Sequence, residues 1–345
     1  MYRAAMNAPL RLRLDGDALV ANWRALAQAS GTAACGAAVK ADGYGLGAVA
    51  VAERLARAGC RDFFVATWAE AVALGPLPDG CSLSVLHGVR EEDMAAALSG
   101  IARPVLNSVE QVARWTVAGG GACDVMVDSG MNRLGLGRDE LVALDGLTIE
   151  TLMSHLASAD EETGQNEAQR TAFAALNGAV PARRMSLANS AGIFLGPDYA
   201  FDLTRPGLAL YGGIPVPSAG PLIRQVVQPE AQIIQRRRIA AGDKVGYNAT
   251  FVADRSMELA ILNIGYADGY LRGFSGKGTA GGGALPVIGR VSMDLIMVCV
   301  DAERGLREGD WVAIDYALPA ASRASGLSQY ELLTGLGQRF DRVWG

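Results

Sequence analysis

The chain has 345 residues, of which 50% are hydrophobic, and its formal net charge is −5. This length and apolar content are enough for one large domain and a smaller one, each with a packed core. Because the chain has no dense cluster of Lys and Arg, we expect neither a nucleic acid nor a membrane as its partner, and a small-molecule substrate is favoured.

The first two thirds of the chain alternate short β-rich runs with helical patterns. Eight strands are predicted, at residues 37–40, 63–67, 84–87, 104–107, 124–128, 151–155, 185–189 and 203–211. Amphipathic helical patterns separate most of them, at 48–58, 69–74, 91–98, 110–117 and 166–176. Eight such units are typical of an α/β fold of the (β/α)8 TIM-like barrel type.

After about residue 226 the pattern becomes mostly β. Strands are predicted at 226–237, 244–246, 257–264, 286–291, 297–300 and 311–314, and the one convincing helix at 329–336. We therefore predict an N-terminal barrel over residues 10–226 and a C-terminal, mostly β domain over 227–345, with residues 1–9 associated with the latter.

The cysteines and the N-terminal segment indicate the cellular compartment in which the protein is expected. The five cysteines (Cys35, Cys60, Cys81, Cys123 and Cys299) are widely spaced and mostly lie in apolar runs, so we expect buried thiols and no disulfide framework. The start of the chain lacks the apolar stretch of a secretory signal, and no later segment is long and apolar enough to span a bilayer. A cytoplasmic location is expected.

Lys40 is the first candidate for chemistry. It ends an apolar predicted strand, and a glycine-broken turn carrying Tyr44 follows it. Barrel enzymes place reactive groups where strands lead into βα loops, and a partly desolvated lysine there can lose its proton and form a Schiff base. The alternative is a lysine that directs its charge into water.

Further polar residues follow the predicted strand ends: Arg133, His155, Asn189, Ser190 and Arg205. Taken singly, Ser190 could be a helix N-cap and Arg205 part of an ordinary turn. Taken together, they describe a pocket for an anionic, carbonyl-bearing cofactor such as pyridoxal 5′-phosphate. Lys40 would hold the carbonyl as an imine, while Ser190, Tyr44 and backbone N–H groups near Gly207 could bind phosphate.

Other motifs are weaker. The GYGLG run at 43–47 is one residue short of the dinucleotide-binding fingerprint, and no GxSxG elbow of a serine hydrolase occurs. Neither of the two histidines has a carboxylate or cysteine at metal-binding spacing, so no metal site is expected.

An ordered set of motifs resembles one known family over nearly the whole chain. The motifs are AVKADGYGLG at 38–47, VDSGMNRLG at 127–135, SHLASAD at 154–160, ANSA at 188–191, RPGLALYG at 205–212, IGYADG at 264–269, GRVSMD at 289–294 and LSQYE at 327–331. The chain resembles the alanine racemases, which are fold-type III pyridoxal-phosphate enzymes with a barrel and a β domain.

The resemblance implies roles for single residues. Lys40 and Tyr266 would be the two catalytic bases, with Lys40 also linked to the cofactor. The other implied cofactor contacts are Tyr44, Arg133, His155, Asn189, Ser190, Arg205, Gly207, Leu208 and Tyr330. His155 would orient Arg205, and Arg133, Met293 and Asp294 would face the substrate. The family also implies a head-to-tail homodimer in which the β domain of one chain closes the barrel of the other.

One position departs from the family pattern. Many members carry a lysine, often carbamylated, two residues before the aspartate of the VDSGMNRLG motif, and this chain has Met126 there. A thioether cannot carry a carbamate, so the anion that usually pairs with the motif arginine, here Arg133, is missing or comes from another source.

Three other functions remain open at this point. A broad-specificity amino-acid racemase is harder to exclude, but such enzymes are typically exported, so the missing secretory signal favours alanine. A pyridoxal-phosphate homeostasis protein would share Lys40 and the phosphate contacts, but would end near residue 230. An amino-acid decarboxylase of the same cofactor fold would lack the segment with Tyr266. The sequence does not separate a biosynthetic from a catabolic alanine racemase.

Overall fold

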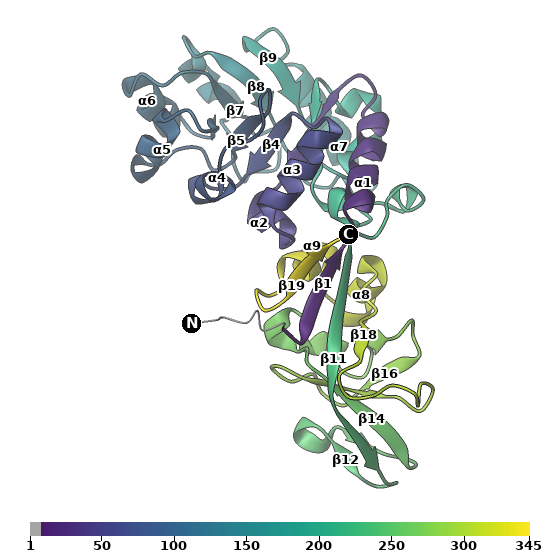
Figure 1. Cartoon of the computed structure of the whole chain (residues 1–345). Coiled ribbons are helices and arrows are strands. Elements are labelled where there is room, and N and C mark those ends of the chain that lie inside the picture. The colour runs from purple at the N-terminus through teal and green to yellow at the C-terminus, as the bar shows by residue number, and fades with distance from the viewer. Residues whose placement is uncertain (1–7) are drawn as a thin grey trace, which may run out of the picture. The chain divides into compact units, whose positions relative to one another are not determined.

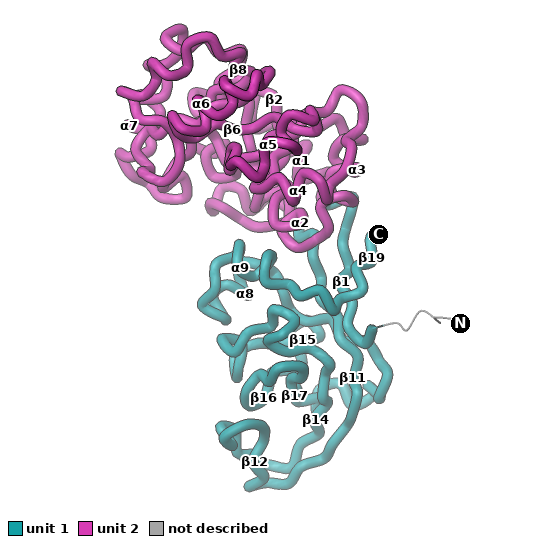
Figure 2. Tube along the Cα trace, turned by 90° about the vertical axis from the view of Figure 1, so that its left-hand side faces the viewer, with its two compact units in different colours: residues 1–18, 225–345 teal, residues 19–224 magenta. Residues whose placement is uncertain are grey.

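The computed structural model describes residues 8–345 and divides the chain into two compact units (Figure 2). One unit is Leu19–Arg224, and the other combines Gln225–Gly345 with the described residues up to Ala18. We call them the barrel unit and the strand-rich unit, and each is described by itself.

The barrel unit is built on a parallel sheet of seven strands in the order β3-β4-β5-β6-β7-β8-β9 (Figure 1). These strands are β3 Ala37–Ala38, β4 Asp62–Val65, β5 Ser82–Val85, β6 Arg103–Leu106, β7 Cys123–Met126, β8 Ile149–Met153 and β9 Ala182–Ser186. Every residue of β4 and β7 is buried, as expected for parallel strands covered on both faces.

Two short strands complete the ring. β10 (Leu203–Thr204) pairs in parallel with β2 (Ala34–Cys35), which directly precedes β3 in the chain. Beyond this pair, the Ala38 N–H donates to the Pro206 carbonyl at 2.9 Å, and the Arg205 N–H donates to the Ala188 carbonyl at 2.8 Å. The predicted TIM-like barrel is therefore confirmed.

Helices accompany the barrel strands (Figure 1). They are α1 Gly16–Ala29, α2 Lys40–Tyr44, α3 Ala48–Ala58, α4 Trp68–Leu74, α5 Met94–Leu98, α6 Val109–Val117 and α7 Gly164–Ala174. Their starts follow capping chemistry, because Thr67, Ser108 and Thr163 each accept a backbone N–H of the first turn. Short 3-10 turns also occur, at η1 Glu91–Asp93, η2 Arg138–Leu144, η3 Gly192–Leu195, η4 Pro197–Tyr199, η5 Leu208–Tyr211 and η6 Pro217–Ala219.

Most of the observed barrel strands begin earlier than the predicted ones, and they end before the polar residues that follow. The largest difference is the predicted strand at 203–211, which is a strand only over Leu203–Thr204 and continues into the 3-10 turn Leu208–Tyr211. The helix Gly16–Ala29 was not predicted.

The strand-rich unit contains a sheet in the order β15-β16-β17-β14-β11-β1-β19, with β18 also paired to β11. The strands are β1 Leu10–Leu14, β11 Val227–Ile239, β14 Met257–Leu262, β15 Thr279–Ala280, β16 Leu285–Ile288, β17 Ile296–Cys299, β18 Trp311–Ala313 and β19 Asp341–Trp344. A separate hairpin pairs β12 Lys244–Val245 with β13 Phe251–Val252. The remaining elements are η7 Tyr247–Ala249, η8 Tyr266–Asp268, η9 Arg272–Phe274, α8 Leu318–Ser325 and α9 Gln329–Thr334.

The structure moves the domain boundary from its predicted place. We expected the barrel to start at residue 10, but Leu10–Leu14 pairs antiparallel with β11 and parallel with β19. Leu10, Leu12 and Leu14 alternate inward and are fully buried, so this sheet needs the segment to complete its core. The predicted association of residues 1–9 with this unit falls mostly on residues outside the described part. Within that part, the Ala8 N–H donates to Asp341 at 2.9 Å.

None of the helices formed by residues 8–345 is long and apolar enough to cross a membrane.

Candidate active site

Lys40 lies at the start of an unusual turn that follows β3. Ala41, Asp42 and Gly43 have φ of 52°, 52° and 61°, and Tyr44 and Gly45 follow with φ 55° and 86°, so five consecutive residues are left-handed. Three of them carry a Cβ, which costs roughly 1–2 kcal/mol per residue in this region. Such a turn persists only when its surroundings hold it, and residues of this kind cluster at functional sites.

Side-chain carboxylates anchor both ends of this turn. Asp42 accepts the N–H of Ala48, the first residue of α3, at 2.8 Å. Glu70, on α4, accepts the N–H of Ala41 at 2.7 Å. The position of Lys40 therefore depends on two neighbouring helices of the barrel as well as on its own strand.

Basic side chains gather around Lys40. Its pKa is lowered, first by burial and then by the positive charges of Arg133 and Arg205, whereas Glu70 opposes this effect. Burial also lowers the pKa of His155 to about 3, with further contributions from Arg205, Arg133 and Lys40. These four predicted residues therefore share one electrostatic environment, and His155 is neutral at physiological pH.

Arg205 is buried and held by groups that sequence reasoning missed. Its guanidinium donates to the Ser186 hydroxyl and, at 2.6 Å, to the backbone carbonyl of Ser154. Burial lowers the pKa of Arg205 to about 10, and the buried carboxylate of Asp124 acts in the opposite direction, so the side chain stays charged at neutral pH. These two neutral acceptors fix the direction of the guanidinium without cancelling its charge.

Tyr44, Ser190 and Gly207 meet at a second part of the barrel unit. The Tyr44 ring stacks on Tyr211 with 4.6 Å between centroids. A Cβ built on Gly207 would lie 2.1 Å from the Tyr44 hydroxyl oxygen, so only glycine allows this approach. The Ser190 hydroxyl accepts the N–H groups of Gly207 at 2.9 Å and Ala209 at 3.2 Å.

This cradle fits a phosphate group. It combines the Tyr44 and Ser190 hydroxyls with the N–H of Leu208, the first residue of the 3-10 turn Leu208–Tyr211, while the N–H groups of Gly207 and Ala209 donate to Ser190; hydroxyl and N–H donors of this kind bind oxyanions. Asn189, the residue before Ser190, has a local role in the structure, because its side-chain oxygen accepts the Gly192 N–H at 2.9 Å.

Tyr266 lies in the strand-rich unit, on the 3-10 turn Tyr266–Asp268. Its N–H donates to the Ser292 carbonyl and the next N–H, of Ala267, donates to the Met293 carbonyl, both at 3.0 Å. The Arg272 guanidinium lies 5.2 Å from the centre of the Tyr266 ring. A guanidinium at this distance makes a cation–π contact with the ring.

Arg339 fastens this turn and was not predicted. It donates two hydrogen bonds of 2.7 Å to the two oxygens of buried Asp268, and a third of 2.6 Å to Asp294. Asp268 also accepts the Gly265 N–H at 3.0 Å. One guanidinium thus joins the Tyr266 turn to the segment with Met293 and Asp294, two predicted substrate contacts. Tyr330, the remaining predicted residue of this unit, lies in α9 and is 47% exposed.

Arg133 and Met126 belong to the segment that departs from the family pattern. Met126 is buried at the end of β7, and Arg133 is exposed on the loop that follows. Within residues 8–345, no carboxylate lies within ion-pair distance of Arg133. No side chain of the described chain has therefore replaced the anion that the family's lysine supplies.

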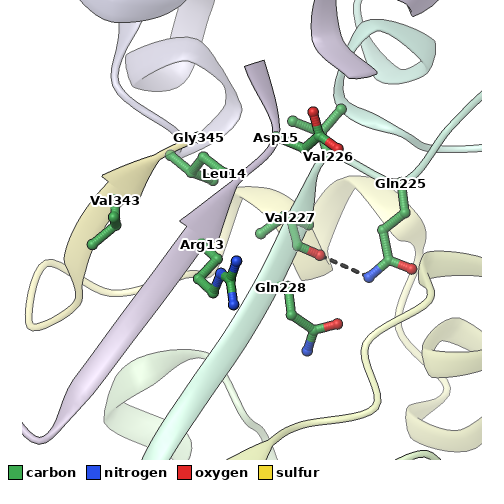
Figure 3. A pocket seen from close by; sticks show the side chains of 9 residues that line it. All are labelled: Arg13, Leu14, Asp15, Gln225, Val226, Val227, Gln228, Val343 and Gly345. Atoms are coloured by element: carbon green, nitrogen blue, oxygen red, sulfur yellow. Dashed lines mark hydrogen bonds between the residues drawn. The ribbon is translucent and has the colours of Figure 1, made fainter. Parts of the chain in front are cut away.

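A hollow on the strand-rich unit is a different feature (Figure 3). It lies beside β1, β11 and β19 and is lined by residues such as Arg13, Gln228 and Val343. It contains none of the predicted site residues, and Gln225 donates to the Val227 carbonyl at 2.8 Å on its wall. The candidate site is therefore the one that the strand ends of the barrel unit form.

The structure thus gives three groups of predicted residues. The barrel unit brings Lys40, Arg133, His155 and Arg205 together, and it brings Tyr44, Ser190 and Gly207 together. The strand-rich unit brings Tyr266, Met293 and Asp294 together.

Comparisons with known proteins agree with this arrangement. Residues 14–215 match the family model of the alanine racemase N-terminal domain, and residues 226–344 match that of the C-terminal domain. The chain therefore belongs to the alanine racemase family, whose members are pyridoxal-phosphate-dependent isomerases.

Individual relatives are similar over nearly their whole length. The alanine racemase of Acidiphilium cryptum is 43% identical, with 98% of this chain and 99% of the relative covered. A biosynthetic alanine racemase of Agrobacterium fabrum is 41% identical, with coverages of 98% and 94%, and a catabolic one of Mesorhizobium japonicum is 41% identical, with coverages of 96% and 92%. The crystal structure of the Bartonella henselae alanine racemase, which has covalently bound pyridoxal phosphate, is 37% identical with a TM-score of 0.89, covering 97% of this chain and 99% of that one.

Proposed function

We propose that this chain racemises alanine with pyridoxal 5′-phosphate linked to Lys40. The observation that carries the proposal is the position of Lys40, on a left-handed turn at a barrel strand end, with its pKa lowered by burial and by two arginines. A lowered pKa increases the share of neutral amine, which is the form that attacks an aldehyde. When bound, the cofactor supplies an electron sink that makes the Cα proton of the amino acid acidic.

Racemisation needs a base on each face of the substrate, because a proton must leave one face and another must arrive at the opposite one. We assign Lys40 to the D-isomer and Tyr266 to the L-isomer. The Arg272 guanidinium, 5.2 Å from the centre of the Tyr266 ring, supports this assignment because it places a positive group beside the ring.

The other residues bind and orient. Tyr44, Ser190, the N–H groups of Gly207 and Leu208, and Tyr330 hold the phosphate. Arg205 would hold the ring nitrogen, with His155 and Asn189 as further cofactor contacts. Because an arginine is effectively never a proton donor at neutral pH, it would leave that nitrogen unprotonated, which would limit electron withdrawal and suppress transamination.

Arg133 binds the cofactor's phenolic oxygen and the substrate carboxylate, opposite Met293 and Asp294. Its freedom from protein carboxylates within the described residues leaves its charge available to both anions.

The proposed site is shared between two chains, so that Lys40 of one chain acts with Tyr266 of the other. Apolar surface beside Tyr266 supports a covering partner, since Met293 is 53% and Leu271 37% exposed. Five unpaired cysteines within residues 8–345 agree with a reducing compartment, and we propose the cytoplasm.

Borohydride reduction followed by peptide mapping tests the role of Lys40. The chain has only three lysines, and the other two, Lys244 and Lys277, are exposed residues of the strand-rich unit. We expect the reduced cofactor on Lys40 alone. A label on Lys244 or Lys277, or an active Lys40→Ala variant with unchanged absorbance, would refute the assignment. Assays of alanine, serine, lysine and arginine with the parent chain measure how broad the specificity is.

A mixed dimer tests the shared site. Lys40→Ala and Tyr266→Phe chains, each nearly inactive alone, rebuild one intact site in every mixed dimer. Random mixing makes about half of the dimers mixed with one good site in two, so activity recovers to roughly a quarter of the parent value. Mixed dimers that are seen by mass but are no more active than the two parents together would place the site within one chain.

A further inference from the structure

We propose that Glu70 is a positioning residue for the cofactor lysine, which it holds in place by accepting the backbone N–H of Ala41. This inference rests on the proposed role of Lys40. Glu70 does not touch the reacting atoms in this scheme. It acts through the backbone of the residue that follows Lys40.

The two carboxylate oxygens of Glu70 face two different segments. Oε2 accepts the N–H groups of Ala66 at 2.6 Å and Thr67 at 3.2 Å, which belong to the loop between β4 and α4. Oε1 accepts the N–H of Ala41 at 2.7 Å, from a residue 29 positions earlier in the chain. The capping box at the start of α4 uses only Oε2, so the contact with Ala41 goes beyond what the helix needs.

The turn after Lys40 needs an outside anchor at this point. Its internal hydrogen bonds begin with the N–H of Gly43, which donates to the Val39 carbonyl at 2.8 Å, and the N–H of Gly45, which donates to Ala41 at 2.9 Å. The Ala41 N–H precedes both, and Ala41 itself has a costly φ of 52°. The Glu70 contact satisfies this donor and fixes the peptide next to Lys40.

Only a carboxylate of this length can serve both segments. A glutamine offers one acceptor oxygen, and its NH2 group would face an N–H donor in either orientation of the amide. An aspartate keeps the charge but is one methylene shorter. The charge matters as well, because Glu70 is the group that opposes the lowering of the Lys40 pKa by Arg133 and Arg205.

The variants Glu70→Gln and Glu70→Asp, with Thr67→Ala as the matched control, test the proposal. Thr67→Ala removes the hydroxyl that accepts the Glu70 N–H at 3.2 Å and weakens the same helix cap, but leaves the Glu70 carboxylate in place. The measurement is the rate at which each cofactor-free protein binds added pyridoxal 5′-phosphate covalently, followed by absorbance and borohydride trapping across pH. Thermal unfolding is measured in parallel.

We expect Glu70→Gln to attach the cofactor at least 10-fold more slowly at high pH, with the pH midpoint of attachment shifted to lower pH. Glu70→Asp should be slow as well but keep its midpoint closer to that of the parent chain. Thr67→Ala should lose thermal stability and keep both rate and midpoint within about twofold.

Parent-like rate and midpoint in Glu70→Gln would overturn the proposal, as would equal kinetic losses in Thr67→Ala. If Glu70→Gln does not fold, Glu70→Asp decides alone, and a parent-like rate then overturns it. Cofactor trapped on a lysine other than Lys40 in the parent chain would instead overturn the proposed function, and this inference with it, so the two failures are distinguishable.

Discussion

The turn that carries Lys40 and the turn that carries Tyr266 are held by different kinds of contact. The first has a left-handed backbone and is anchored by backbone N–H groups that donate to the carboxylates of Glu70 and Asp42. The second is a 3-10 turn, fixed by an arginine that binds two aspartates at once. The Lys40 turn therefore depends on backbone geometry, and the Tyr266 turn on an ion-pair cluster.

The surrounding charge differs in the same way. Lys40 shares its environment with Arg133 and Arg205, neither of which has a carboxylate partner in the described chain. The charge of Arg339, in contrast, is balanced by Asp268 and Asp294. The barrel unit is thus prepared to receive anions, whereas the Tyr266 turn is neutralised and needs only to stay in place.

The largest expected effect comes from a substitution in the Tyr266 turn. Tyr266→Phe should lower Cα deuterium exchange from L-alanine by at least ~100-fold and exchange from D-alanine far less, because the variant removes one of two stereochemically distinct bases. Exchange in deuterated water, followed for each isomer separately, measures this difference. Equal losses for the two isomers would reject a two-base mechanism.

Removing Arg339, which holds the same turn, should have a smaller effect. Arg339→Met leaves Asp268 buried without its partner, and we expect a loss of about 2 kcal/mol in the unfolding free energy, less than for a fully buried pair because Arg339 is 48% exposed. Exchange from L-alanine should again fall more than exchange from D-alanine. Asp294→Asn is the control, since Asp294 is 49% exposed and its loss should cost well under ~1 kcal/mol. Similar destabilisation by both variants would contradict the role given to Asp268.

His155, which is neutral in the barrel unit, predicts that the free energy of unfolding falls in acid. Burial lowers the pKa of His155 from 6.5 to about 3, so between these values the unfolded chain binds a proton that the folded chain does not. Stability therefore falls with decreasing pH through this window, by on the order of 1 kcal/mol per pH unit from this group. His155→Gln should flatten the slope of unfolding free energy between pH 5 and about 6.5. The exposed His87, changed to Gln, is the control, and an equal flattening there would refute the prediction.

The smallest expected effect concerns Arg133. Because Met126 supplies no anion, chloride or small carboxylates should change the KM for alanine about threefold, while bicarbonate has no special effect. Met126→Lys should lower this KM or make it depend on carbon dioxide. Steady-state kinetics at constant ionic strength measure both. Kinetics that respond to neither the anion nor the substitution would mean that another group already fills the role.

The sequence predicted the barrel well because its strands are buried on both faces and read as continuous apolar runs. It also carried a signal that was missed, since Leu10–Leu14 alternates strictly between leucine and arginine. Even with that signal, the partners of the strand could not be read, because Arg11 pairs with Glu230, 219 residues away.

In the candidate site, too, the sequence predicted some features and not others. Lys40, His155 and Arg205 could be found because they follow predicted strands and lie in motifs. The left-handed turn could not, since alanine and tyrosine disfavour a positive φ and the anchor at Glu70 lies 29 residues from Ala41. Arg339 gave no local signal either, because its partners, Asp268 and Asp294, belong to other segments.

The position of β1 has a consequence for protein synthesis. It lies between β11 and β19 in the sheet, so the first strand of the described chain cannot complete its pairing until the last strand has been translated. At typical ribosomal speeds that delay is on the order of 20 to 60 s, during which Leu19–Arg224 emerges complete and is free to fold. Any pause or premature stop before Asp341 leaves one edge of β1 open, with its backbone N–H and C=O groups unpaired. Nascent chains stalled before Asp341 should therefore depend on chaperones more than complete chains do.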